Sequence, residues 1–232
     1  MLLGSLDRDA LFRFLGYGNP RADVVFIGAD EALTAAILSD EGANVRSAFT
    51  PVADLRAATR ARAALPPTPP PAVAPTWTTM TRILLALQGR FDPTVDEIRD
   101  YQRERFGSEN EPAALIELMP ARAGEVATWP FAGLFPEFPT RDEYRGRYLE
   151  DRIAMLQMHL AYEPRIVVAY GEENWELFKC IFPAVRVWRA DGLFEFGKLR
   201  DTNVVLTPHF AAPSMHGGRR ALLKALVALQ AA

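Results

Sequence analysis

Short apolar runs alternate with longer amphipathic stretches along this chain. The runs at residues 24–28, 114–119, 165–170 and 204–208 are almost continuously apolar, and Gly, Pro or polar residues bound each of them. Strands that are buried on both faces of a parallel sheet have this pattern, whereas half-exposed strands alternate apolar and polar positions. The runs therefore predict four buried strands.

Helical periodicity fills the segments between these runs. Thr94 followed by Glu97 is typical of a helix start, and a glycine such as Gly89 is typical of a helix end. The predicted helices lie at residues 30–40, 76–89, 94–107, 140–163, 172–182 and 218–229.

Strands that alternate with helices favour an α/β fold, here a three-layer sandwich around a central, mostly parallel four-stranded sheet. The pair 193–197 and 203–207 predicts one antiparallel neighbour. We expect a single domain over residues 1–232, with a proline-rich surface segment at about 64–75 that suits neither helix nor central strand.

Composition narrows the function classes. The net charge of −3 gives no global attraction to nucleic acid, so a polyanion would need a local patch such as His216, Arg219, Arg220 and Lys224, which otherwise form a solvated helix face. No apolar run approaches the length of about 20 residues that a spanning helix needs. Acidic residues near the start argue against a signal peptide, so we expect a cytoplasmic protein that does not enter a membrane.

The cysteine and histidine pattern indicates no cofactor and no metal site. Cys180 is the single cysteine, which excludes a four-cysteine metal site. It lies in an amphipathic stretch, and we expect its thiol to be buried. A phosphate-binding glycine loop of the Walker type is also absent.

Residues just after parallel strands meet at the ligand-binding edge of an α/β sheet. Gly28, Asp30 and Glu31 follow the first strand. Asp30 suits a helix N-cap, and also a fixed negative charge that orients water or stabilises a cationic transition state. Glu31 is either a surface acid of the first helical turn or, with Asp30, a ligand for Mg²⁺.

His209 follows the last strand and is aimed at the same edge. It is either a neutral donor toward developing negative charge or a loop residue bonded to backbone. In the loop beyond it, Ser214 offers a hydroxyl, Met215 an apolar tip, and the backbone of Gly217 and Gly218 offers donors for phosphate. The substrate-binding candidates that complete the set are Arg219 and two aromatic residues that suit stacking on a base, Phe49 and Trp77.

Two segments, "NPRADVVFIGAD" and "LTPHFAAPSMHGGR", resemble the uracil-DNA glycosylase superfamily, and in particular a bacterial branch of glycosylase-like proteins. The resemblance covers about the first 33 residues, the strand "RIVVAYG" and about the last 30 residues. It implies a hydrolase of DNA repair in which Asp30 holds the catalytic acidic position and His209 hydrogen-bonds the departing base. It also implies that Met215 lies near the side chain that enters the duplex.

The chain differs from the strictest uracil enzymes of that superfamily in two short segments. Glu31 and Ala32 stand where those enzymes have Pro and Tyr, and Met119 and Pro120 stand where a base-reading Asn is found. Three hypotheses follow. The first is a uracil-DNA glycosylase-like protein that binds a nucleobase or nucleotide and hydrolyses an N-glycosidic bond in DNA; the second is a non-catalytic nucleotide or nucleic-acid binding module; the third is a small-nucleoside or metal-dependent hydrolase. The sequence leaves the oligomeric state open.

Overall fold

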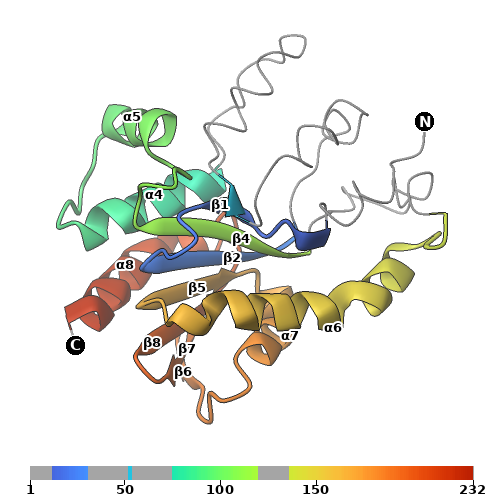
Figure 1. The fold of residues 1–232 in the computed structure, drawn as a ribbon. Helices are drawn as coiled ribbons and strands as arrows, with labels where there is room; N and C mark the ends of the chain where they lie inside the picture. Colours follow the sequence, from blue (N-terminus) through green and yellow to red (C-terminus); the bar gives the residue numbers. More distant parts are fainter. Residues whose placement is uncertain (1–11, 31–51, 54–74, 120–135, 232) are drawn as a thin grey trace, which may run out of the picture.

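The computed structural model describes residues 12–30, 52–53, 75–119 and 136–231 (Figure 1). Its strands are β1 (Gly16–Gly18), β2 (Val24–Asp30), β3 (Val52–Ala53), β4 (Ala113–Met119), β5 (Ile166–Tyr170), β6 (Arg189–Asp191), β7 (Phe194–Leu199) and β8 (Thr202–Thr207). Its α-helices are α4 (Pro75–Leu87), α5 (Val95–Glu104), α6 (Arg141–His159), α7 (Trp175–Ile181) and α8 (Met215–Ala231), with 3-10 turns at Leu160–Tyr162 and Glu172–Asn174.

The sheet is mixed and wider than the expected four strands. Its order is β3-β1-β4-β2-β5-β8-β7-β6. The four predicted strands form its centre, β4-β2-β5-β8, and are mutually parallel. The predicted antiparallel neighbour is β7, which pairs with β8, while β1 pairs antiparallel with β4 at the other side.

The sequence did not predict β1 and β6, which lack the apolar signal of the central strands. β1 is Gly-Tyr-Gly, and a Cβ on Gly16 would overlap the carbonyl oxygen of Leu115 on the neighbouring strand. β6 is Arg-Ala-Asp and is exposed along its whole length. Short strands made of glycine or charged residues carry no hydrophobic pattern.

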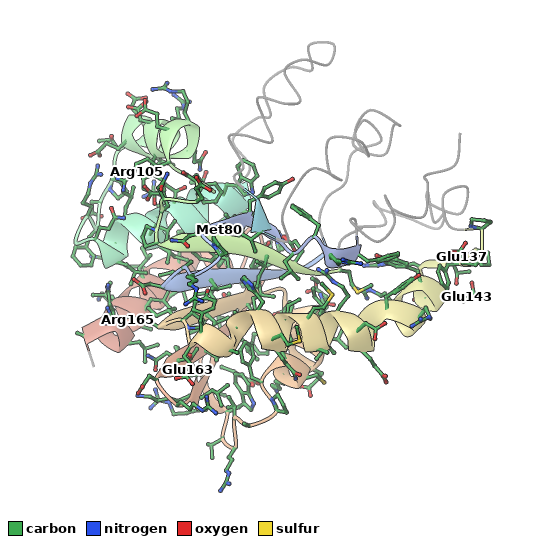
Figure 2. The ribbon with its side chains drawn as sticks, in the orientation of Figure 1. Met80, Arg105, Glu137, Glu143, Glu163 and Arg165 are labelled. Carbon is green, nitrogen blue, oxygen red and sulfur yellow. The ribbon has the colours of Figure 1, made fainter. Side chains whose placement is uncertain are left out.

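Helices cover both faces of the sheet, as Figure 1 shows. Along β2, Val25 and Ile27 point into the core under α6 and α7, whereas Phe26 points into the core under α4, α5 and α8. Met80 of α4, labelled in Figure 2, is part of this second core. This double burial explains the continuous apolar run of the strand.

The helix ends follow the sequence signals closely. Thr94 and Glu97 form the expected capping box, in which the Glu97 N–H donates to the Thr94 hydroxyl at 3.2 Å. Thr140 and Glu143 form the same motif at the start of α6. Asp30, the first residue of the helix predicted at 30–40, is the last residue of β2, and residues 31–40 lie outside the described residues. The surface segment at residues 64–74 is also outside them, and Pro75 is the first residue of α4.

Cys180 is exposed, so the prediction of a buried thiol was wrong. In the short helix α7 the inward positions belong to Phe178 and Ile181. Cys180 turns to the outer side, where its thiol donates to the carbonyl oxygen of Glu176 at 3.2 Å. Within the described residues, no helix has the length and apolarity to cross a bilayer.

A buried arginine joins α6 to the end of the central sheet. Arg152 is 1% exposed and donates to the backbone carbonyl oxygens of Glu117 and Leu118, both at 2.8 Å. It also donates to the carbonyl oxygens of Phe12 and Phe14, just before β1. A guanidinium carries its charge into the interior only when its donors are satisfied. These carbonyl oxygens accept the hydrogen bonds of the guanidinium, and the same bonds hold the carboxyl end of β4 in place.

Replacing Arg152 with Met is expected to lower the free energy of unfolding by at least about 3 kcal/mol, because the carbonyl oxygens would stay buried without donors. The matched control is Arg99→Met, because the Arg99 side chain is 61% exposed and pairs only loosely with Asp96. The control should stay within about 0.5 kcal/mol of wild type. Urea unfolding of the three proteins measures both effects, and equal midpoints for Arg152→Met and Arg99→Met would contradict the structural role.

Candidate functional site at the carboxyl edge of the sheet

Polar groups gather where the central parallel strands end. Gly28 of β2 lies in register with Glu117 of β4, and Tyr170 of β5 lies in register with Thr207 of β8. All four strands run in the same direction, so their carboxyl ends share one edge. This is the edge at which α/β proteins bind ligands.

Glu117 and Tyr170 form a hydrogen-bonded pair across β2. The Tyr170 hydroxyl donates to the Glu117 carboxylate at 3.1 Å, and both residues are half-buried. Between them, Gly28 has no side chain, and a Cβ there would overlap the Glu117 carboxylate and lie 2.5 Å from the Tyr170 hydroxyl. The absence of a side chain at Gly28 therefore lets the carboxylate and the phenol meet.

Sequence reasoning missed Glu117 and Tyr170. Glu117 interrupts the apolar strand "AALIELM", and a carboxylate inside a buried strand is the signal that could have revealed it. Tyr170 is the last residue of β5, so it belongs to the apolar strand pattern and not to the residues after a strand, where functional groups are expected. Neither signal says which neighbour the side chain meets.

The imidazole of His209 is exposed, but its orientation is fixed from two sides. The N–H of Ala211 donates to Nδ1 of His209 at 3.3 Å, which makes Nδ1 the acceptor and places the proton of the neutral ring on Nε2. The ring lies 5.7 Å from the ring of Tyr170. The next residue, Phe210, is fully buried and stacks on the same Tyr170 ring, with ring centroids 4.9 Å apart. The loop thus has a buried anchor and presents a polar tip.

Asp30 is the last residue of β2, in register with Met119 of β4. Its side chain is outside the described part of the chain. Only β5 separates β2 from β8, so the ends of these two strands are about 10 Å apart at the usual spacing between strands. The backbone therefore brings Asp30 and the His209 loop to one edge of the sheet.

The other predicted site residues are distributed differently. Glu31 and Phe49 lie outside the described residues. Trp77 is half-buried on α4, where its ring packs 5.3 Å from that of Phe106, so it serves the core between α4 and α5. Ser214 is exposed directly before α8, and Arg219 is partly buried one turn into that helix.

Two expectations for the loop before α8 do not fit the structure. Met215 is 0% exposed and packs in the core, with its sulfur 3.6 Å from the Thr207 hydroxyl, so it is not an apolar tip at the surface. Gly218 is buried, and its N–H already donates to the Ser214 carbonyl oxygen at 3.2 Å, which leaves it unavailable to a phosphate. Both residues lie on the inner face of α8, since the helix begins three residues earlier than expected.

A hollow lies at the amino edge of the sheet, opposite the carboxyl edge. It has a volume of about 660 Å³, and its lining includes Asn19, Arg21, Met158, His159 and Tyr162. Burial lowers the pKa of His159, whose ring packs edge-on against Tyr162. None of the residues predicted to be functional lines this hollow.

The buried carboxylate of Glu111 forms hydrogen bonds within the protein. Glu111 accepts from the Tyr101 hydroxyl at 2.9 Å and from Arg105, labelled in Figure 2, at 2.7 Å. Burial and this carboxylate raise the pKa of Tyr101. Across the described ranges, no group of three or more His, Cys, Asp or Glu side chains forms a candidate metal site.

No family model matches the sequence, and no curated protein matches it at a significant level. Only the residues at the carboxyl ends of the central strands therefore indicate which chemistry this edge supports. A carboxylate, a phenol and an Nε2–H donor lie there together, and they suit a flat polar heterocycle that needs acceptors, donors and an aromatic surface.

Replacing Gly28 with Ala is expected to separate Glu117 from Tyr170 and to lower the free energy of unfolding by about 1–3 kcal/mol, because the added methyl group overpacks the site. In the Glu117→Ala background the same substitution should cost less, since the clash with the Glu117 carboxylate is removed. Gly146→Ala on α6 is the control: nothing lies within 4 Å of its Cβ, and a helical Ala should be neutral or stabilising by about 0.5–1 kcal/mol. Urea unfolding gives all three values, and additive losses at positions 28 and 117 would refute the contact.

Proposed function

We propose that this chain is a uracil-DNA glycosylase-like protein that binds a nucleobase or nucleotide at the carboxyl edge of its sheet and hydrolyses the N-glycosidic bond of a damaged base in DNA. The observation that carries the proposal is the fixed His209 imidazole beside the Tyr170 and Glu117 pair, at the edge where β2 ends in Asp30. The resemblance at both ends of the sequence supports it.

The electrostatics of the reaction suit this arrangement. As the C–N bond breaks, its electron pair leaves with the base, so positive charge develops on the sugar and negative charge on the base. Asp30 would stabilise the sugar cation and orient the water that adds to the anomeric carbon, accepting a proton from it. The Nε2–H of His209 would donate a hydrogen bond to the departing base. One anion and one neutral donor, about 10 Å apart, would then stand on opposite sides of the bond.

Glu117 and Tyr170 add selectivity for the base. A carboxylate only accepts hydrogen bonds, so Glu117 favours a base whose edge presents N–H groups. The Tyr170 ring offers a stacking surface that Phe210 supports from behind. Stacking of this kind contributes about 1–3 kcal/mol per base.

A binding module without catalysis is the second candidate, and the position of Met215 favours it. A glycosylase that acts on a duplex fills the gap left by the extruded base. Met215 was the residue expected to do this, yet it lies in the core. The net charge of −3 also supplies no general attraction to DNA. A small-nucleoside hydrolase is compatible with the same two observations.

Oligonucleotides that carry uracil, hypoxanthine, xanthine or an alkylated base provide the test. We expect wild-type protein to convert at least one of them to an alkali-sensitive abasic site. Asp30→Asn should reduce cleavage at least about 100-fold, because the water and the cation lose their carboxylate, while binding stays within about threefold. Asp96→Asn is the control, because the Asp96 side chain is 88% exposed on α5, and its activity should equal wild type.

The same assay separates the candidates. Cleavage by Asp30→Asn at the wild-type rate would refute the role of Asp30. Salt-dependent binding without cleavage of any substrate would support the binding module. Turnover of free nucleosides without DNA binding, or stimulation by Mg²⁺, would identify a small-molecule hydrolase instead.

A further inference from the structure

Two arginines lie on the packed helices α4 and α8, close enough for their positive charges to repel each other. Arg82 lies on α4 and Arg219 on α8, and both are partly buried. The helices share one hydrophobic core, to which Ile83 of α4 and Leu222 of α8 belong, and they lie side by side in Figure 1. The two arginines therefore lie at the contact between α4 and α8, here called the seam, and the shared core holds the two helices together.

This pair lacks the partners that other arginines of the chain have. Arg90, Arg103, Arg105 and Arg200 each form an ion pair with a nearby carboxylate. Among the described residues, neither Arg82 nor Arg219 does so, and the buried Nε atom of each has no acceptor. Burial lowers the pKa of Arg219, and the positive charge of Arg82 lowers it further.

Two positive charges that are close together and partly shielded from water destabilise the folded state unless an anion binds between them. A fully exposed arginine has the freedom to turn away, but here both side chains are partly buried and each Nε atom is shielded from water. An oxyanion between the two groups would accept from both Nε–H donors and from the adjacent terminal N–H donors. Guanidinium groups match the oxygens of a phosphate particularly well.

We propose that Arg82 and Arg219 together bind a phosphate group at the seam between α4 and α8. Arg219 lies four residues after Met215, the first residue of α8, which places it about 6 Å along the helix axis from the N-terminus. The positive end of the helix dipole adds to the attraction.

This site would serve the proposed function as a backbone contact, and that part of the inference rests on the proposed function. The His209 loop leads directly into α8, so a phosphate at the seam lies close to the edge where the base would bind. A nucleic-acid strand or a nucleotide could then place its base beside Tyr170 and a phosphate between the two arginines. Free phosphate has the same chemistry, so the test must distinguish these sources.

Thermal unfolding with and without inorganic phosphate, at an ionic strength held constant with NaCl, tests the site itself. Phosphate should raise the midpoint of wild type, and Arg82→Met or Arg219→Met should lose at least half of this shift. Without phosphate, each variant should be as stable as wild type or more stable, because a repulsive charge is removed. Arg220→Met is the matched control, exposed on the next position of α8, and it should keep the full shift.

Fluorescence anisotropy with a labelled single-stranded oligonucleotide and with a labelled nucleoside monophosphate distinguishes the sources. If the strand is the ligand, each Arg variant should bind it about 3–10-fold more weakly, and its log–log salt slope should be shallower by about 0.7. Loss of binding only for the monophosphate would identify a nucleotide site, and an effect restricted to inorganic phosphate would identify a free-phosphate site.

The outcome is separable from the fate of the glycosylase proposal. The phosphate shift should persist in Asp30→Asn, whether or not wild type cleaves any base. An equal shift in wild type, Arg82→Met, Arg219→Met and Arg220→Met, or no shift beyond that of NaCl in wild type, would overturn the proposed site.

Discussion

The carboxyl edge of the sheet depends on one buried cation, Arg152. Its guanidinium is held by carbonyl oxygens rather than exposed to water, and two of these belong to Glu117 and Leu118 at the end of β4. The carbonyls of Phe12 and Phe14 tie the chain before β1 to the same group. Because each donor has a fixed direction, the backbone that carries Glu117 has little freedom. A charge buried on one face of the sheet thus positions a carboxylate that points to the other.

The second constraint is the missing side chain at Gly28, which lets Glu117 and Tyr170 meet across β2. Phe210 then holds Tyr170 from behind and anchors the loop that presents His209. The polar edge therefore rests on rigid strands and buried rings. Preorganised groups of this kind bind and stabilise charge more strongly than mobile ones, because no reorganisation is needed when the ligand arrives.

The sequence predicted the elements whose signal is local. The central strands were recognisable because residues such as Val25 and Phe26 are buried on opposite faces, and α5 was recognisable from the Thr94 and Glu97 cap. The short strand β1 was missed because its close packing against β4 selects glycine, which carries no hydrophobic pattern. Cys180 was assigned to the wrong side of its helix and Met215 to an exposed loop, because the buried face depends on tertiary packing. The Glu117 and Tyr170 pair needed the strand register, which no local pattern supplies.

The central claim is that a base binds between the ends of β2 and β8, beside His209. The sequence has three histidines, so ¹H–¹⁵N NMR of their side chains during titration with a modified-base oligonucleotide tests it most directly, with assignments from single His→Gln variants. If a base binds there, His209 should have an Nε2–H tautomer in the free protein. Its imidazole signals should shift saturably with added oligonucleotide, while those of His159 at the amino edge stay unchanged. An Nδ1–H tautomer, or shifts of His159 without any change at His209, would contradict it.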